Sequence, residues 1–234
     1  MIINFLIIIQ EKYGIIKRNI REEFMKGLYT IGHSRHTMEY FISLLKKYNI
    51  NYLLDVRSIP YSSHAEQFNK ENIMAALKTA GINYSPMGSY FGARPVEKEL
   101  YNREGYLDFE KVAKSVRFNK GMDNVILGLH RGNRIALMCT EKDPIDCHRA
   151  IMVARAFDVR GIKVSHILPN GSILTQRGLD DRLLEMFFPD RGQISFFDDI
   201  SDTSDTELII QAYRKRNEQI GYRISSGKTD MVIV

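Results

Sequence analysis

Short, mainly apolar runs alternate along this chain with segments in which apolar residues recur at helical spacing. Runs of four or five such residues are typical of strands that are covered on both faces. The runs that predict strands are residues 28–31, 52–56, 82–85, 135–138 and 163–167. Helical segments between them predict crossovers that join parallel strands. The pattern therefore predicts a single three-layer, Rossmann-like α/β domain with a mostly parallel sheet of about five strands.

Residues that cap or stop helices stand where the helical spacing begins and ends. Thr37, Asn69 and Asp108 each precede such a segment, and their side-chain oxygens can accept hydrogen bonds from the free amides of a first helical turn. Gly81 and Gly161 follow two predicted helices, at the position where a left-handed residue commonly ends a helix. The predicted helix after Asp108 has Phe109, Val112 and Val116 on one face.

The stretch from residue 134 to 155 combines a strand, a turn and a helix, and it contains both cysteines. Asp143 stands immediately before Pro144, which is the order expected for an N-cap and the first helical residue. Asp146 then lies in the first turn, where the helix dipole favours a carboxylate. The predicted helix begins at Pro144 and is almost entirely apolar apart from His148, Arg149 and Arg155.

The two ends of the chain depart from this pattern. Residues 1–27 are predicted to be an N-terminal extension, which is either an addition from a misplaced start or an extra strand and helix. The apolar run 1–9 is far shorter than the roughly 20 residues that cross a bilayer, and it lacks a signal-peptide pattern, so no membrane partner is predicted. After the α/β domain, 28–188, the acidic residues 189–206 predict a linker. Residues 207–234 predict a basic helix and a tail.

Composition narrows the protein class only a little. With 234 residues the chain can form one good hydrophobic core, and its formal charge of +5 permits nucleic-acid or phosphate partners. Two cysteines are too few for a disulfide framework, so a reducing, cytoplasmic setting is expected. Composition assigns neither a cofactor nor an oligomeric state.

Three polar clusters follow predicted strands. They are Gly32-His33-Ser34, Asp55-Val56-Arg57, and the stretch from Cys139 to Arg149. In open α/β sheets, ligands bind outside the carboxyl ends of the strands. We therefore expect these clusters to meet in a site at that edge of the sheet.

The leading hypothesis is an enzyme that binds a small anionic, nucleotide-like ligand through its phosphate or carboxylate group. Arg57 and Arg149 would hold the anion, because guanidinium groups pair with such groups through two parallel hydrogen bonds. His33 and His148 are acid/base candidates, because imidazole titrates near neutral pH. Cys139 is either a nucleophile or an inert buried thiol.

The candidate residues divide into two groups. Those assigned to catalysis are His33, His148, Cys139 and Glu141. Those assigned to ligand binding are Gly32, Ser34, Asp55, Arg57, Arg149 and Cys147. In a structural interpretation of the same residues, Asp55 and Arg57 form an internal salt bridge, while His148 and Arg149 are buried against carboxylates such as Asp55 or Glu141. A buried charge without such a partner costs several kcal/mol.

Two rival functions belong to other classes. A metal-dependent hydrolase or redox protein would use the cysteines with His148 and His33. However, the spacing C-x7-C-H lacks the C-x2-C pattern of structural zinc sites, and adjacent helical residues point about 100° apart, so no metal ligand is assigned. A non-catalytic nucleic-acid-binding module would use the aromatic residues between 84 and 106 and the basic residues 214–216.

The motifs, in this order, resemble those of the domain-of-unknown-function 488 family of bacteria and archaea. The matching residues are 29–34, Asp55-Val56-Arg57, Gln67-Phe68, 88–92, and Cys139-x-Glu141-x-Asp143-Pro144-x-x-Cys147-His148-Arg149. The resemblance covers roughly residues 28–188. It implies the α/β fold and carries no particular activity.

Overall fold

The sheet at the centre of the molecule has six strands in the order β3-β2-β4-β1-β5-β6. The computed structural model describes residues 27–190 and 205–224. The strands are β1 (Leu28–Gly32), β2 (Tyr52–Asp55), β3 (Asn83–Pro86), β4 (Ile135–Cys139), β5 (Val164–Ile167) and β6 (Ile173–Thr175). β1 to β5 run parallel, and β6 pairs antiparallel with β5. The predicted Rossmann-like α/β fold with a mostly parallel sheet is therefore confirmed, with one strand more than about five.

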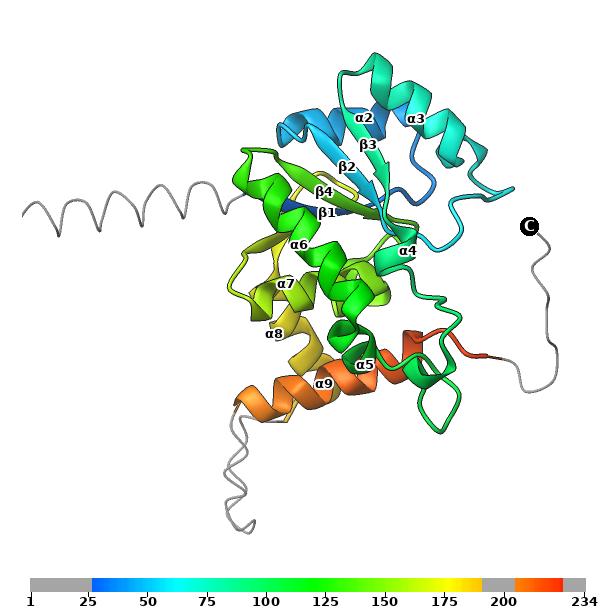
Figure 1. Cartoon of the computed structure of the whole chain (residues 1–234). Coiled ribbons are helices and arrows are strands. Elements are labelled where there is room, and N and C mark those ends of the chain that lie inside the picture. Colours follow the sequence, from blue (N-terminus) through cyan, green and yellow to red (C-terminus); the bar gives the residue numbers. More distant parts are fainter. Residues whose placement is uncertain (1–26, 191–204, 225–234) are drawn as a thin grey trace, which may run out of the picture.

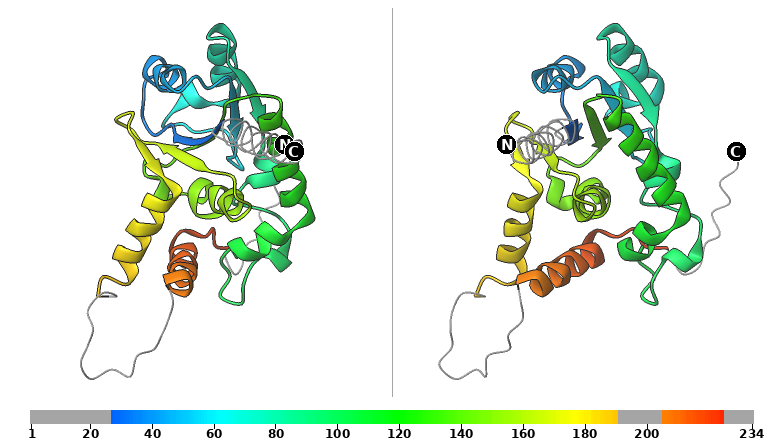
Figure 2. Two further views of the ribbon diagram at one scale, coloured as in Figure 1. Left: turned by 90° about the vertical axis from the view of Figure 1, so that its left-hand side faces the viewer. Right: turned by 60° about the vertical axis from the view of Figure 1, so that its left-hand side comes forward.

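Helices cover both faces of this sheet (Figures 1 and 2). α2 (Met38–Lys47) and α3 (Lys70–Thr79) pack on one face, over inward side chains such as Leu53 and Met138. On the side of the other face lie α5 (Phe109–Lys114), α6 (Val116–His130), α7 (Arg155–Val159), α8 (Gln176–Phe187) and α9 (Asp205–Ile220), of which α5 and α9 pack mainly against other helices. The short helices are η2 (Glu66–Phe68), α4 (Gly88–Phe91), η3 (Lys98–Leu100), η4 (Pro144–Asp146) and the π-helix η5 (Arg149–Ala154).

Most of the predicted helix caps and stops are present. The side chain of Thr37 accepts from the Tyr40 amide at the start of α2, and Asp108 caps α5. Asn69 occupies the cap position of α3, but its side chain accepts from the Ser62 amide instead. Gly81 and Gly161 have φ of 75° and 77°, the left-handed backbone that ends a helix at low cost for glycine.

The segment after Asp108 forms two helices, so the prediction of a single helix with Phe109, Val112 and Val116 on one face is wrong. Ser115 has extended backbone, ends α5 and caps α6 through a hydrogen bond from the Phe118 amide. The chain changes direction there, and the side chain of Val116 is 86% exposed. α6 then continues to His130.

The helix after β4 does not begin at Pro144, as the sequence predicted. Asp143 caps only the single turn η4, and Cys147 then takes an extended conformation, with φ −133° and ψ 136°. The carbonyl of Cys147 accepts from the amides of Ala150 and Ile151, so Cys147 itself stands at the start of the helix. Asp143 and Asp146 therefore precede this helix and do not belong to its first turn.

The C-terminal helix α9 packs on the same core as the α/β domain. Ile209, Ala212 and Tyr213 are buried in it, and the side chain of Asn217 bonds the backbone of Leu107 and Phe109. The predicted extension, 1–27, and acidic linker, 189–206, lie almost wholly outside the described residues. Among the helices that the structure describes, none is long and apolar enough to cross a bilayer.

Candidate functional site

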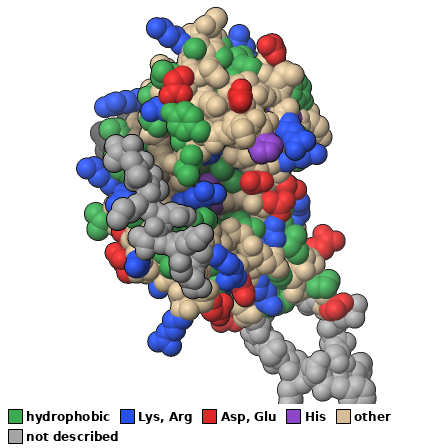
Figure 3. Space-filling model, turned by 90° about the vertical axis from the view of Figure 1, so that its right-hand side faces the viewer, with side chains coloured by type: hydrophobic (Ala, Val, Ile, Leu, Met, Phe, Trp, Pro, Cys, Tyr) green, Lys and Arg blue, Asp and Glu red, His purple; other side chains and the backbone are tan. Residues whose placement is uncertain are grey.

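The strand order places the three polar clusters side by side. β4 lies between β1 and β2, and each of these strands ends in one cluster. Backbone hydrogen bonds continue the sheet past its strands, from the His33 amide to Cys139 and from the Val56 amide to Met138. Figure 3 shows the molecule from the right-hand side of Figure 1, which is the side toward which the strand arrows point. Basic and acidic side chains both lie around the middle of that face. The predicted convergence at the carboxyl edge is present.

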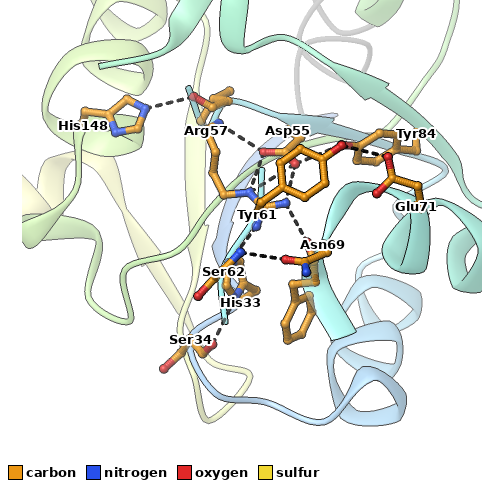
Figure 4. A network of polar contacts seen from close by, with 12 residues as sticks. His33, Ser34, Asp55, Arg57, Tyr61, Ser62, Asn69, Glu71, Tyr84 and His148 are labelled. Carbon is orange, nitrogen blue, oxygen red and sulfur yellow. Dashed lines mark hydrogen bonds and ion pairs between the residues drawn. The ribbon is translucent and has the colours of Figure 1, made fainter. Parts of the chain in front are cut away.

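A buried ion pair joins Asp55 and Arg57 in the centre of Figure 4. The guanidinium donates to both carboxylate oxygens, with Nη2–Oδ2 at 2.6 Å and Nε–Oδ1 at 2.9 Å. Asp55 also accepts from the hydroxyl of Tyr84 at 2.9 Å, and Arg57 donates to the carbonyl of Phe68 at 2.8 Å. Both side chains are almost fully buried. The pair thus has the geometry of the internal salt bridge, and the ligand-binding role of these two residues stays a prediction.

His33 completes this network and is fully buried. Its Nε2 accepts from Arg57 Nη1 at 3.2 Å, because a guanidinium can only donate. Its Nδ1 therefore carries the proton and donates to the Ser34 carbonyl at 3.0 Å. The ring stacks on Phe68, with the ring centres 4.3 Å apart. Burial, reinforced by the charge of Arg57, lowers the pKa of His33 to about 4.

The backbone of Ser34 positions the carbonyl that His33 bonds. Ser34 has a φ of 47°, a left-handed conformation that is uncommon outside glycine. Its amide donates to the Thr140 carbonyl at 2.9 Å, which links the ends of β1 and β4. The sequence placed Ser34 among the ligand-binding residues, and the structure places it at the partly exposed rim of the cluster.

A second buried histidine was missed by sequence analysis. His166 on β5 contacts the hydroxyl of Thr30 at 2.8 Å and the side-chain oxygen of Gln176 at 2.9 Å. Gln176 in turn donates to the hydroxyl of Tyr213 at 2.6 Å, so this network joins β1, β5, α8 and α9. Burial, together with the charge of Arg149, lowers the pKa of His166 to about 3. The sequence signal that could have identified His166 is the presence of a polar residue within an apolar predicted strand.

We expect stability to fall with acid because these two histidines stay neutral in the folded protein. Their folded pKa values, about 4 for His33 and about 3 for His166, lie below the ordinary value of about 6.5 that the unfolded chain has. The unfolded state therefore binds more protons as pH falls below 6.5, and each histidine then costs about 1.4 kcal/mol per pH unit. For His33 this loss extends down to about pH 4.

The measurement is urea unfolding at several pH values between 7 and 4.5, combined with NMR titration of the two imidazole rings. We expect His33→Gln to reduce the number of protons taken up on unfolding at pH 5 by about one. A His33 ring that titrates near pH 6.5 in the folded protein would contradict the assignment.

Cys139, Cys147 and His148 form the second part of the site, at the end of β4. His148 Nδ1 lies 3.8 Å from Cys139 Sγ and 4.0 Å from Cys147 Sγ. Its other nitrogen, Nε2, donates to the carbonyl of Val56 at 3.2 Å. The three potential ligand atoms all lie within 4.8 Å of one another. Both cysteines are buried and free, and His148 is partly exposed.

The two thiols differ in acidity. A hydrogen bond with Cys147, together with burial, raises the pKa of Cys139 well above its ordinary value. Burial also raises the pKa of Cys147, but the hydrogen bond from Cys139 and the charge of Arg149 outweigh it and hold that pKa well below the usual range. The sequence left Cys139 as either a nucleophile or an inert buried thiol, and this environment favours Cys147 as the thiolate.

Arg149 is fully buried and only partly paired. Its Nη1 donates to the main-chain carbonyl of Glu141 at 2.7 Å. Its Nε and Nη2 are buried and have no hydrogen-bond partner within the part of the chain that the structure describes. The sequence offered the Glu141 carboxylate as a partner of Arg149 or as a catalytic group. Glu141 is an exposed residue, and it is its backbone carbonyl that accepts a hydrogen bond from Arg149.

Two glycines permit close contacts around the site. A Cβ at Gly32 would lie 1.9 Å from the Glu141 carbonyl oxygen and 3.2 Å from Arg149 Nη2. A Cβ at Gly88 would lie 2.2 Å from the carbonyl oxygen of Arg57. Both distances to oxygen are far below van der Waals contact, so glycine is required at both positions for the backbones to approach.

The acidic residues of η4 are neutralised by arginines from the C-terminal part of the chain. Arg182 of α8 forms two hydrogen bonds with the Asp143 carboxylate, at 2.8 and 3.0 Å. Arg216 of α9 pairs with Asp146 and donates to the Ile145 carbonyl at 3.0 Å. Arg216 is one of the basic residues 214–216 that the sequence offered as a nucleic-acid contact. In the structure its side chain stabilises the η4 turn. The two partners of each pair are too far apart in the sequence for a local pattern to predict the contact.

Comparison with known proteins gives one match. A family model described as domain of unknown function DUF488 matches residues 37–156, which is just over half of the chain. The matched segment contains Asp55, Arg57 and the cluster from Cys139 to Arg149. No curated protein and no solved structure matches the chain.

Proposed function

Since this chain belongs to the DUF488 family, a membership that names no reaction, we propose an activity from its site alone: a cytoplasmic enzyme that binds the phosphate or carboxylate group of a small, nucleotide-like ligand. The ligand binds at the carboxyl edge of the sheet, beside the ends of β1 and β4. The observation that carries the proposal is the buried guanidinium of Arg149.

Arg149 supports anion binding because its charge is fully buried and its hydrogen bonding is incomplete. One of its nitrogens meets the Glu141 carbonyl, while Nε and Nη2 are unpaired in the described chain. A buried guanidinium left in this state costs several kcal/mol, whereas a phosphate or carboxylate would offer it paired oxygens and the missing charge. Since Arg149 has no exposed surface, the group that reaches it must be the small terminal group of a ligand.

The surrounding charges favour the same kind of ligand. Asp143 and Asp146 lie close to Arg149 in the sequence and would repel an anion, but Arg182 and Arg216 pair with them. His148 stands at the partly exposed side of the cluster, so a ligand would meet its side chain first. Arg57 acts as a positioning residue that holds His33.

We expect anionic ligands to stabilise the wild-type protein and to leave Arg149→Met unchanged. Methionine approximates the volume of the arginine stem and removes the charge. A ligand at 100 times its dissociation constant raises the free energy of unfolding by about 2.7 kcal/mol. The measurement is thermal unfolding of both proteins with inorganic phosphate, nucleoside mono- and triphosphates, and small di- and tricarboxylates. Arg214→Met is the matched control, since Arg214 pairs with Glu110 on the exposed surface.

The ligand-free stability of Arg149→Met provides an independent check. Replacing an unpaired buried charge with an apolar side chain of similar volume is neutral or stabilising, so this variant should unfold within about 1–2 kcal/mol of the wild type. A variant that is much less stable would assign Arg149 a structural partner and remove the basis for an anion site. If a ligand stabilised the wild type and Arg149→Met equally, that ligand would bind at a site that does not include Arg149.

A further inference from the structure

We infer that Cys139, Cys147 and His148 form a three-ligand site for a thiophilic divalent metal ion, of which Zn²⁺ is the best fit. The site lies at the carboxyl end of β4, the central strand of the trio β2-β4-β1. Thiolate and imidazole are the ligands that zinc prefers in proteins. This inference depends on the arrangement of these three side chains and does not rest on the proposed anion-binding function.

Two of the three separations between the ligand atoms lie close to those of tetrahedral zinc. Zn–S bonds of about 2.3 Å and Zn–N bonds of about 2.0 Å place sulfur and nitrogen about 3.5 Å apart at a tetrahedral angle. The two observed separations from His148 Nδ1 are 3.8 Å to Cys139 Sγ and 4.0 Å to Cys147 Sγ. Side-chain shifts of a few tenths of an ångström therefore bring the nitrogen to this separation from each sulfur, and all three atoms lie within 4.8 Å of one another.

The histidine is already oriented as a metal ligand. A carbonyl oxygen can only accept, so the 3.2 Å contact between Nε2 and the Val56 carbonyl fixes the proton on Nε2. In the neutral imidazole, Nδ1 then presents its lone pair to the two sulfurs. Metal-bound histidines generally donate their other N–H to a carbonyl or carboxylate, which fixes both the tautomer and the ring orientation.

The backbone explains how two adjacent residues can bind one ion. In a helix Cys147 and His148 would point about 100° apart, which is why the sequence argued against a shared metal. Cys147 is extended, with φ −133° and ψ 136°, and the helical backbone begins at His148, with φ −56° and ψ −26°. This change of conformation turns both side chains toward Cys139. The break between η4 and η5 is thus the feature that assembles the cluster.

Three ligands leave one coordination position for water or a ligand, as in catalytic rather than structural zinc sites. Two thiolates and a neutral imidazole balance the charge of a divalent ion. An anion in the fourth position would then add a negative charge within reach of the buried Arg149. This last step rests on the proposed function, whereas binding of the metal does not.

The test is metal analysis of the full, untagged chain, purified under reducing conditions with Zn²⁺ in the medium. We expect about one equivalent of zinc to remain after dialysis. Replacement by Co²⁺ should produce the visible bands of tetrahedral cobalt and a near-ultraviolet thiolate band. His148→Gln should weaken zinc binding by more than about 100-fold, since even loss of a supporting residue costs 10–100-fold. His64→Gln, which changes an exposed histidine, is the matched control and should bind zinc as the wild type does.

Three results would overturn the inference. They are less than about 0.1 equivalent of zinc in wild-type protein, undiminished zinc in His148→Gln, and a Cys139–Cys147 disulfide in the reduced preparation, seen as two fewer titratable thiols. The Co²⁺ spectrum of the wild type keeps the inference testable if His148→Gln fails to fold. Zinc binding without any effect of anions would leave this site in place and refute only the proposed anion function.

Discussion

Replacing Asp55 with asparagine is expected to lower the free energy of unfolding by about 3–5 kcal/mol. Asparagine keeps the shape of the side chain but removes the charge that faces Arg57, whose Nη2 lies 2.6 Å from the Asp55 carboxylate. The guanidinium would then remain buried with the Phe68 carbonyl and the His33 ring as its main acceptors. Removing one partner of a buried ion pair leaves an uncompensated charge, and that desolvated charge dominates the cost.

Guanidinium chloride unfolding followed by circular dichroism measures this effect, and it corresponds to roughly 6–20 °C in melting temperature for a chain of this size. Glu110→Gln is the matched control because it breaks the ion pair with Arg214, whose side chain is largely exposed. Surface pairs contribute at most about 1 kcal/mol. The double variant Asp55→Leu/Arg57→Met removes both charges and should recover much of the loss, since apolar replacement of a whole buried pair is often neutral.

The same measurement separates the two interpretations of Asp55 that its sequence context leaves open. A cost below about 1 kcal/mol would mean that the carboxylate contributes little to folding and is available to a ligand. The expected cost would instead make Asp55 and Arg57 a rigid support for His33 and for the end of β2. In that case the ligand-facing side of the site consists of residues from the ends of β1 and β4.

The parts of the fold that sequence could predict are those with local causes. The apolar runs of β1, β2 and β4 and the helical spacing after Thr37 depend on residues within a few positions. The convergence of three polar clusters followed from one topological rule, that parallel strands share a carboxyl edge. By contrast, β6 has three residues and little burial, which is too short for a periodic signal.

The geometry of the site depended on contacts that no local pattern contains. Asp143 and Pro144 do start a helical turn, but His148 follows an extended Cys147. Its side chain contacts the Val56 carbonyl, which is distant in sequence, as well as the Cys139 thiol. A pattern extended from Pro144 therefore places Cys147 and His148 on the wrong faces. The role of the Glu141 carbonyl could not be predicted for the same reason, because every residue has a backbone carbonyl and only the fold selects the one that meets Arg149.

Gly32→Ala is expected to destabilise the protein by about 3 kcal/mol or more, at or above the upper end of ordinary overpacking. The added Cβ would lie 1.9 Å from the backbone oxygen of Glu141, and a backbone atom cannot move aside as a flexible side chain does. Displacing this loop would also break the 2.7 Å hydrogen bond that Glu141 accepts from Arg149. The variant should therefore lose stabilisation by anionic ligands even at temperatures where it is folded.

Gly81→Ala is the matched control for this experiment, because it separates steric conflict from backbone strain. Gly81 has a φ of 75°, and a Cβ there would meet no atom within 4 Å, so alanine should cost only the left-handed strain of about 1–2 kcal/mol. Chemical unfolding of the two variants gives the comparison directly. Equal costs would show that the Glu141 loop moves freely and that Gly32 has no packing role. A larger cost at Gly32, together with lost ligand response, would show that contact between the ends of β1 and β4 holds Arg149 in place.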